Sequence, residues 1–200
     1  MFHQIILVLL IVAILFFISF PFIKRIVLKN KFINIYGNEV KRFAKKNNLT
    51  SLNSIKLANI NDEVEIDHIL FGKKFIYLIT DFYLDGIVTG DEESNSWIYI
   101  TRFKRKASYI RNLLALGEEK ISSFSLHGEI DKDVLVHISL LNSDSELKIK
   151  SENFKNSLIV KTRDLHKIIR KFESQNIKEF DKEQLEIVIE EIVGKNEKGK

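Results

Sequence analysis

Residues 63–82 read EVEIDHILFGKKFIYLITDF and predict a β-hairpin from which the rest of the domain can be traced. Residues 63–70 alternate, with Val64, Ile66 and His68 on one side and acidic side chains on the other, as the two-residue period of a strand requires. Residues 75–82 are rich in aromatic and β-branched residues, and Gly72 with the two lysines after it supplies a turn.

Apolar periodicity extends this prediction in both directions along the chain. It predicts a helix at 35–46, because Tyr36, Val40, Phe43 and Ala44 share one helical face. After the hairpin it predicts strands at 87–89 and 97–102, a helix at 106–119, strands at 134–140 and 157–160, and two closing helices with apolar stripes from Leu165 and Leu185. The order is typical of an α/β domain with a mixed sheet and flanking helices.

The N-terminal residues predict a membrane span. Residues 5–20 read IILVLLIVAILFFISF, and no charged residue lies between Met1 and Lys24. The apolar run at 5–23 would cover roughly 28 Å as a helix, close to the hydrocarbon thickness of about 30 Å. Fourteen of the residues 5–20 are Leu, Ile, Val or Phe, which together favour insertion by roughly 4–8 kcal/mol. A cleaved signal peptide and a buried core helix are the alternatives, and the sequence favours neither.

The flanks of this run predict its orientation and the division of the chain. Lys24, Arg25, Lys29 and Lys31 follow it, whereas residues 1–4 contain no Lys or Arg, so the positive-inside rule places the remainder in the cytoplasm. We expect a single-pass cell-membrane protein with a transmembrane helix at 1–23, a basic juxtamembrane connector at 24–34, an α/β domain at 35–193 and a polar tail at 194–200. The lipid bilayer is the expected partner, and the four cations are candidate contacts to anionic lipid.

Charge and motif content narrow the function classes. Thirty-one Lys and Arg against twenty-seven Asp and Glu give a net charge of +4, which does not predict strong nucleic-acid binding. A local cluster is a candidate contact to nucleic acid or lipid, with a solvated surface as the alternative; it contains Arg102, Lys104, Arg105 and Lys106. The sequence lacks a Gly-rich phosphate loop, an H-E-x-x-H motif and a G-x-S-x-G motif. The absence of cysteine excludes thiolate chemistry.

Several short motifs resemble those of the NERD, or nuclease-related, domain family. The matching segments are a Gly-Asn-Glu helix start at 37–39, the EIDHIL strand at 65–70, the strand at 76–79, Gly-Ile-Val-Thr-Gly at 86–90 and Trp97. The strand at 158–160 and the helix from Leu165 also fit, so the resemblance covers about residues 37–192. It implies a restriction-endonuclease-like fold of the PD-(D/E)xK class and a site at which carboxylates hold Mg²⁺ beside a phosphodiester.

The resemblance also assigns the candidate site residues. It places Glu39 and Asp67 at two acidic positions of the family's metal site, as candidate metal ligands and vestigial catalytic residues. It places Thr80 and Phe82 where the family has an acidic residue and a lysine, and neither side chain can do that work. Asp81 lies between them, but strand alternation points it to the opposite face unless a bulge re-aims it. Solvated surface positions are the alternative for Glu39 and Asp67.

We therefore expect a membrane-anchored, catalytically degenerate domain that acts as a binding or interaction module without a cofactor. The sequence does not name its protein partner. The alternative is a nuclease that acts on DNA or RNA with Mg²⁺ in a rearranged site, using Glu39, Asp67 and Asp81. A third hypothesis is an accidental resemblance and a different membrane-tethered module, which a fold without Asp67 beside Thr80 would favour.

Overall fold

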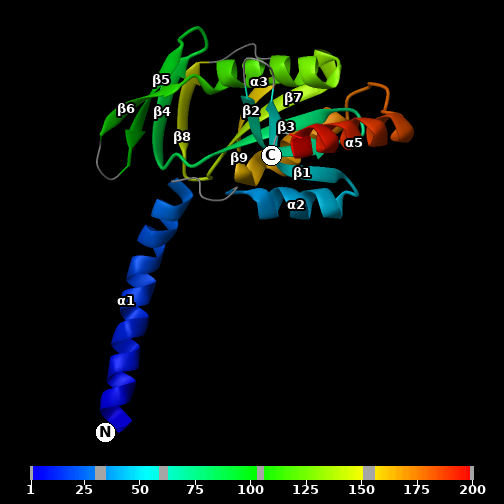
Figure 1. Ribbon diagram of the computed structural model, residues 1–200. Coiled ribbons are helices and arrows are strands. Elements are labelled where there is room, and N and C mark those ends of the chain that lie inside the picture. The colour runs from blue at the N-terminus through cyan, green and yellow to red at the C-terminus, as the bar shows by residue number, and fades with distance from the viewer. Residues whose placement is uncertain (1, 30–34, 59–62, 103–105, 151–155, 199–200) are drawn as a thin grey trace. The chain divides into compact units, whose positions relative to one another are not determined.

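The computed structural model describes residues 2–29, 35–58, 63–102, 106–150 and 156–198 (Figure 1). The chain forms two compact units, Met1–Ile35 and Tyr36–Lys200. The first unit consists of helix α1 (Phe2–Lys29), which includes residues 24–29 of the predicted connector. Its apolar side chains are exposed, and Phe17 is 78% exposed. Among the described residues, no helix meets the length and hydropathy required of a membrane span.

The second unit contains a five-stranded sheet in the order β1-β2-β3-β7-β9. Strands β1 (Thr50–Ala58), β2 (Glu63–Phe71) and β3 (Ile76–Phe82) are antiparallel, and β7 (Leu135–Leu141) and β9 (Ser157–Lys161) continue the sheet in parallel. The predicted hairpin is confirmed: His68 lies opposite Ile79 in β2 and β3, and the Gly72 N–H donates to the Phe75 carbonyl at 2.9 Å across the turn.

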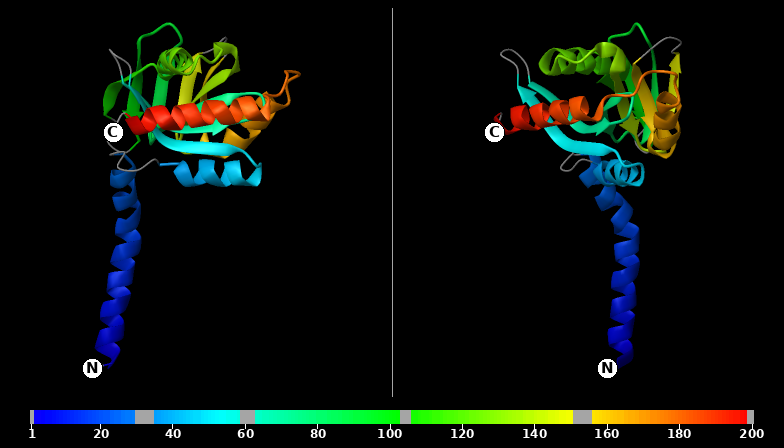
Figure 2. Two further views of the ribbon diagram at one scale, coloured as in Figure 1. Left: turned by 45° about the vertical axis from the view of Figure 1, so that its right-hand side comes forward. Right: turned by 90° about the vertical axis from the view of Figure 1, so that its right-hand side faces the viewer.

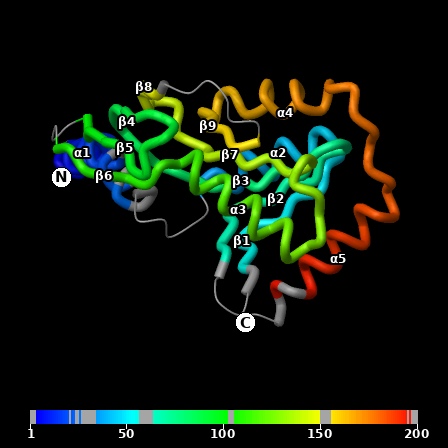
Figure 3. Tube along the Cα trace, turned by 90° about the horizontal axis from the view of Figure 1, so that it is seen from above, coloured from blue at the N-terminus to red at the C-terminus, as the bar shows by residue number. Residues whose placement is uncertain are grey.

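Helices cover both faces of this first sheet, and Figures 1 and 2 show α2 and α3 on opposite sides of it. Helices α3 (Leu113–Gly128) and α5 (Lys182–Lys198) share a buried cluster with the sheet, which contains Ile69, Phe71, Leu78, Ile121, Phe124 and Ile192. Helices α2 (Gly37–Lys46) and α4 (Leu165–Glu173) pack around the other face, where the Phe75 and Phe172 rings meet edge to face at 5.2 Å. Figure 3 shows the segment between α4 and α5 running around the outside of the domain.

A second sheet, in the order β6-β5-β4-β8, stands beside the first. It consists of β4 (Gly86–Asp91), β5 (Ser96–Thr101), β6 (Ala107–Arg111) and β8 (Glu146–Lys150), and β8 pairs with β4 in parallel. Trp97 is fully buried in its core with Val88 and Tyr99, against Leu113 and Leu114 at the start of α3. Two short 3₁₀ helices, Lys132–Val134 and Thr162–Asp164, complete the unit.

The structure therefore confirms a mixed α/β domain with flanking helices. The strands form two mixed sheets, which the sequence did not distinguish, because β4 to β6 and β8 form a sheet of their own. The predicted helix at 106–119 is wrong, because residues 107–111 pair with β5 and α3 begins only after Asn112, whose Oδ1 accepts from the Leu114 and Ala115 N–H groups. The apolar spacing had placed Ile110 on the inner face of the predicted helix together with residues of α3. In the structure Ile110 belongs to β6 and lies opposite Trp97 of β5. Strands β1 and β8 were not predicted, since their short runs are polar.

A buried chain of polar groups links three strands of the first sheet to the start of α2. The His68 ring lies between Asn53 and Asp81, with Nδ1 2.6 Å from Asn53 Oδ1 and Nε2 2.9 Å from Asp81 Oδ2. The same Asp81 oxygen accepts the main-chain N–H of Tyr36 at 2.9 Å. His68 and Asp81 are both buried. One carboxylate thus holds the first residue of the second unit against the middle of the sheet.

Substitution of Asp81 by Ala should destabilise the second unit strongly. It removes the acceptor of two buried donors, on His68 and Tyr36, and each unsatisfied buried group costs about 1–3 kcal/mol, so we expect a loss of about 2–6 kcal/mol. Urea unfolding followed by the fluorescence of Trp97, the only tryptophan, measures the change. Asp133→Ala, at an exposed carboxylate, should change stability by less than about 0.5 kcal/mol. Equal unfolding midpoints for the two variants would contradict the assigned role of Asp81.

Candidate functional site

Asp67 and Thr80 lie beside each other on β2 and β3. Asp67 is half-buried, and its Oδ2 accepts the main-chain N–H of Asp81 at 2.7 Å. Thr80 is almost fully buried and turns its hydroxyl toward α3, where Lys120 contacts it. Two of the candidate site residues, Asp67 and Thr80, are therefore brought together. A fold in which they lay apart would have favoured a different membrane-tethered module.

Lys120 of α3 brings a cation to Thr80, and the sequence did not lead us to expect it there. Its Nζ donates to Thr80 Oγ1 at 3.0 Å and to the main-chain carbonyl of Glu65. Lys120 precedes the buried Ile121 and lies three residues after the buried Gly117, at the border of the helix's inner face. That helical position was a usable signal, but the predicted helix ended at residue 119 and left Lys120 out.

His137 of β7 is the third member of the cluster. Its Nε2 is 3.0 Å from Thr80 Oγ1, and the ring is fully buried. Burial and, to a smaller extent, the nearby Lys120 ammonium lower the pKa of His137 to about 3. The imidazole is therefore neutral at physiological pH, and Thr80 links a cation on one side to a neutral ring on the other.

Gly117 allows α3 to approach β7 at this point. A Cβ atom at residue 117 would overlap the Ser157 hydroxyl and the His137 ring. Ser157 in turn donates to the Leu114 carbonyl at 2.9 Å, which fixes the helix against β9. Because the helix lies this close to the sheet, Lys120 can reach Thr80 from one turn further along.

The other predicted residues lie apart from this cluster. Glu39 is exposed on α2, which packs on the face that carries the His68 and Asp81 side chains. Asp81 points away from Thr80, as strand alternation predicts, and no bulge re-aims it. Phe82 is partly buried and packs against the core of the second sheet. A metal site formed by Glu39, Asp67 and Asp81 together is therefore not assembled.

Mg²⁺ does not fit the residues gathered around Asp67. The ion requires several oxygen ligands in near-octahedral geometry, whereas Thr80 offers one neutral hydroxyl that already contacts an ammonium and an imidazole. Among the described residues, no three or more His, Asp or Glu side chains are grouped so that they could hold a metal ion. The ammonium of Lys120 would also repel a divalent cation placed beside Thr80.

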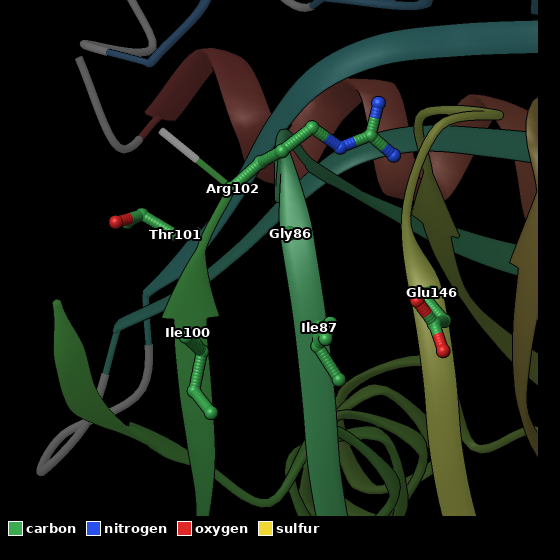
Figure 4. A pocket seen from close by; sticks show the side chains of 6 residues that line it. All are labelled: Gly86, Ile87, Ile100, Thr101, Arg102 and Glu146. Atoms are coloured by element: carbon green, nitrogen blue, oxygen red, sulfur yellow. The ribbon is translucent and has the colours of Figure 1, made fainter. Parts of the chain in front are cut away.

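The predicted basic contacts are distributed over both units. Lys24, Arg25 and Lys29 belong to α1, while Lys31, Lys104 and Arg105 lie outside the described residues. Arg102 and Lys106 are exposed at the two ends of the β5–β6 connection. Figure 4 shows Arg102 lying across Gly86 at the rim of a hollow of about 330 Å³, which Ile87, Ile100, Thr101 and Glu146 also line.

Comparisons with known proteins do not assign the chain to a family. No family model matches the sequence, and no curated protein matches it. The fold is similar to the crystal structure of AF1548, a protein of unknown function, with a TM-score of 0.42 and 11% identity over 80% of this chain and 78% of that chain. A likeness at this level assigns neither a family nor an activity.

The neutral state of His137 should make the second unit less stable in acid. An unfolded histidine takes up a proton near pH 6.5, while folded His137 does so only near pH 3. Between these values the unfolded state binds one more proton, so stability should fall by up to about 1.4 kcal/mol per pH unit as pH decreases.

Replacing His137 by Gln should flatten this dependence between pH 6.5 and about 4. Urea unfolding of the wild type and the variant at several pH values measures the slope. His166→Gln, at an exposed histidine of α4, provides the matched control and should leave the wild-type slope in place. An unchanged slope in the His137 variant would show that the acid dependence has another origin.

Proposed function

We propose that the chain is a membrane-anchored, NERD-like protein whose nuclease-type site has lost its metal chemistry and whose domain serves as a binding or interaction module. In this proposal α1 crosses the cell membrane once, and the second unit lies in the cytoplasm. The observation that carries the proposal is the contact between Lys120 and Thr80 at 3.0 Å. A cation of the protein itself occupies the position beside the strand where the resemblance implies a carboxylate with a bound metal ion.

The surroundings of that contact support a structural role. Thr80 joins Lys120 of α3 to His137 of β7, while Asp67 receives a main-chain N–H from β3. Each interaction connects two secondary-structure elements of the domain. Asp67 is the only carboxylate among these four side chains, whereas phosphodiester hydrolysis by metal ions requires further carboxylate ligands. Asp67 and Thr80 therefore connect elements of the fold in this chain.

The membrane anchor in the proposal rests on the sequence of residues 5–23 and on the side chains of α1. Apolar side chains are exposed on all sides of the helix, from Ile5 at 51% to Ile26 at 61%. A helix that is apolar all round requires lipid or a large protein around it. The cations that follow residue 23 give the orientation with the second unit in the cytoplasm.

The alternative of an active nuclease has one observation in its favour. Lys120 brings an ammonium to the Asp67 side of β3, and an ammonium there is the group that Phe82 lacks. This alternative still requires a second acidic ligand beside Asp67. The two candidates for that ligand, Glu39 and Asp81, are on the opposite side of the sheet from Thr80.

A cleavage assay separates the two functions. The full chain in detergent is incubated with DNA and with RNA in the presence of Mg²⁺ or Mn²⁺. We expect no metal-dependent cleavage above a mock purification, and the same result for Asp67→Ala, because the ligand set for the ion is incomplete. Cleavage by the wild type that Asp67→Ala abolishes would overturn the proposal and establish the nuclease.

The anchor can be tested by extraction of membranes at alkaline pH. The full chain should remain in the membrane pellet. A variant with Ile11→Lys and Leu15→Lys should be released, because each charge near the centre of a span costs about 2.5–3.5 kcal/mol and the pair offsets the roughly 4–8 kcal/mol from the apolar run. Leu126→Lys, at an exposed position in the second unit, is the control and should stay in the pellet. Release of the wild type would contradict membrane anchorage.

A further inference from the structure

The outer face of the second sheet carries exposed apolar side chains. Alternation along β5 buries Trp97 and Tyr99 and turns Ile98 and Ile100 outward. Ile98 is 40% exposed and lies opposite Tyr109 of β6, which is 80% exposed. On the other side of β5, Ile100 lies opposite Ile87 of β4. The inner side of the sheet is thus a core, whereas on the outer side these apolar side chains are in contact with solvent and lie beside the polar residues Thr89, Glu146 and Lys148.

Cations border this surface at the end where β4 begins. Arg102 and Lys106 are exposed there, and Arg102 is held in place by its main-chain N–H on the Asp85 carbonyl at 3.1 Å and by its guanidinium on the Asp144 carbonyl at 2.9 Å. Figure 4 shows its guanidinium above the hollow, with Ile87 of β4, Ile100 of β5 and Glu146 of β8 below it. The charge of Glu146 is offset by Lys148 at 3.2 Å.

The end of the sheet that carries these cations lies close to the start of the second unit. The second unit starts at Tyr36, whose hydroxyl donates to the Phe82 carbonyl at 3.4 Å. From Phe82 only three residues lead to Gly86, the first residue of β4. Tyr36 and the start of β4 are therefore near each other within the second unit.

We infer that the outer face of the second sheet docks on a bilayer surface that contains anionic lipid. Arg102 and Lys106 face the lipid phosphates, and Tyr109, Ile98 and Ile100 enter the interfacial region, where aromatic and apolar side chains are favoured. A nucleic acid would be attracted by the cations but gains little from exposed isoleucines, and this favours lipid. The inference rests on the proposed membrane anchorage and adds a second, reversible contact to it.

The absence of cysteine in the chain allows a direct test with single-cysteine variants. Tyr109→Cys is labelled with a fluorophore, and the full chain is reconstituted into vesicles that carry a nitroxide quencher on their headgroups. Leu126→Cys, 75% exposed on α3, is the matched control position. Vesicles of phosphatidylcholine alone are compared with vesicles that also contain phosphatidylglycerol. Flotation of the same samples shows whether the chain is anchored.

Docking predicts that the label at 109 is quenched in vesicles with phosphatidylglycerol and much less in phosphatidylcholine alone, while the label at 126 changes little. Quenching at 109 should be lost in the double variant Arg102→Glu and Lys106→Glu and in about 1 M salt, where the Debye length is only about 3 Å. Lys167→Glu with Lys171→Glu, two exposed cations of α4, gives the same change in net charge and should keep the quenching.

The possible outcomes separate the inference from the proposed function on which it rests. Failure of the chain to float with the vesicles would contradict the anchor and the docking together. Flotation without quenching at 109, or with equal quenching at 109 and 126, would overturn the docking alone. An oligonucleotide could also be added to the vesicles. If it remained bound to the chain and the label at 109 lost its quenching, the surface would be assigned to nucleic acid and the docking on lipid would be overturned.

Discussion

The alternation of side chains at Thr80 and Asp81 separates the polar chemistry of the domain into two networks. Asp81 points toward α2, where it meets His68 and the main chain of Tyr36. Thr80 points toward α3, where it meets Lys120 and His137. Because neighbouring residues of a strand lie on opposite faces, the carboxylate of Asp81 does not lie on the face that carries Thr80 and Lys120. The absence of a shared acidic site follows from this backbone geometry.

Each network connects strands of the first sheet to a helix. On the α2 side, a buried carboxylate receives donors from β2 and from the start of the second unit. On the α3 side, the small size of Gly117 lets the helix approach closely, and Lys120 then completes the contact to Thr80. Buried polar groups stabilise a fold only when they find partners. Asp67, Thr80 and Asp81 find such partners in this domain.

The second sheet gives the domain a different kind of surface. Its inner side forms a core with the start of α3, whereas its outer side carries exposed apolar residues beside Arg102 and Lys106. Such a combination of apolar and cationic groups matches the chemistry of a lipid interface. The capacity of this protein to bind would then lie on the second sheet, away from the residues that resemble a nuclease site.

The sequence alone determined the local features, because strands and helices repeat their apolar positions roughly every two to four residues along the chain. The hairpin at 63–82, the strands near 135–141 and 157–161, the closing helices and the opposite directions of Thr80 and Asp81 all follow from spacing between near neighbours. Asp67 and Thr80 could be named because short motifs of the sequence resemble those of a known family. Tertiary structure alone decided the rest. Strands β1 and β6 form by pairing with their neighbours β2 and β5, and β8 forms by pairing with the distant β4. Lys120 and His137 meet Thr80 only because α3 and β7 pack beside β3. The contacts of Thr80 join residues 40 and 57 positions apart, and no period in the sequence records such a distance.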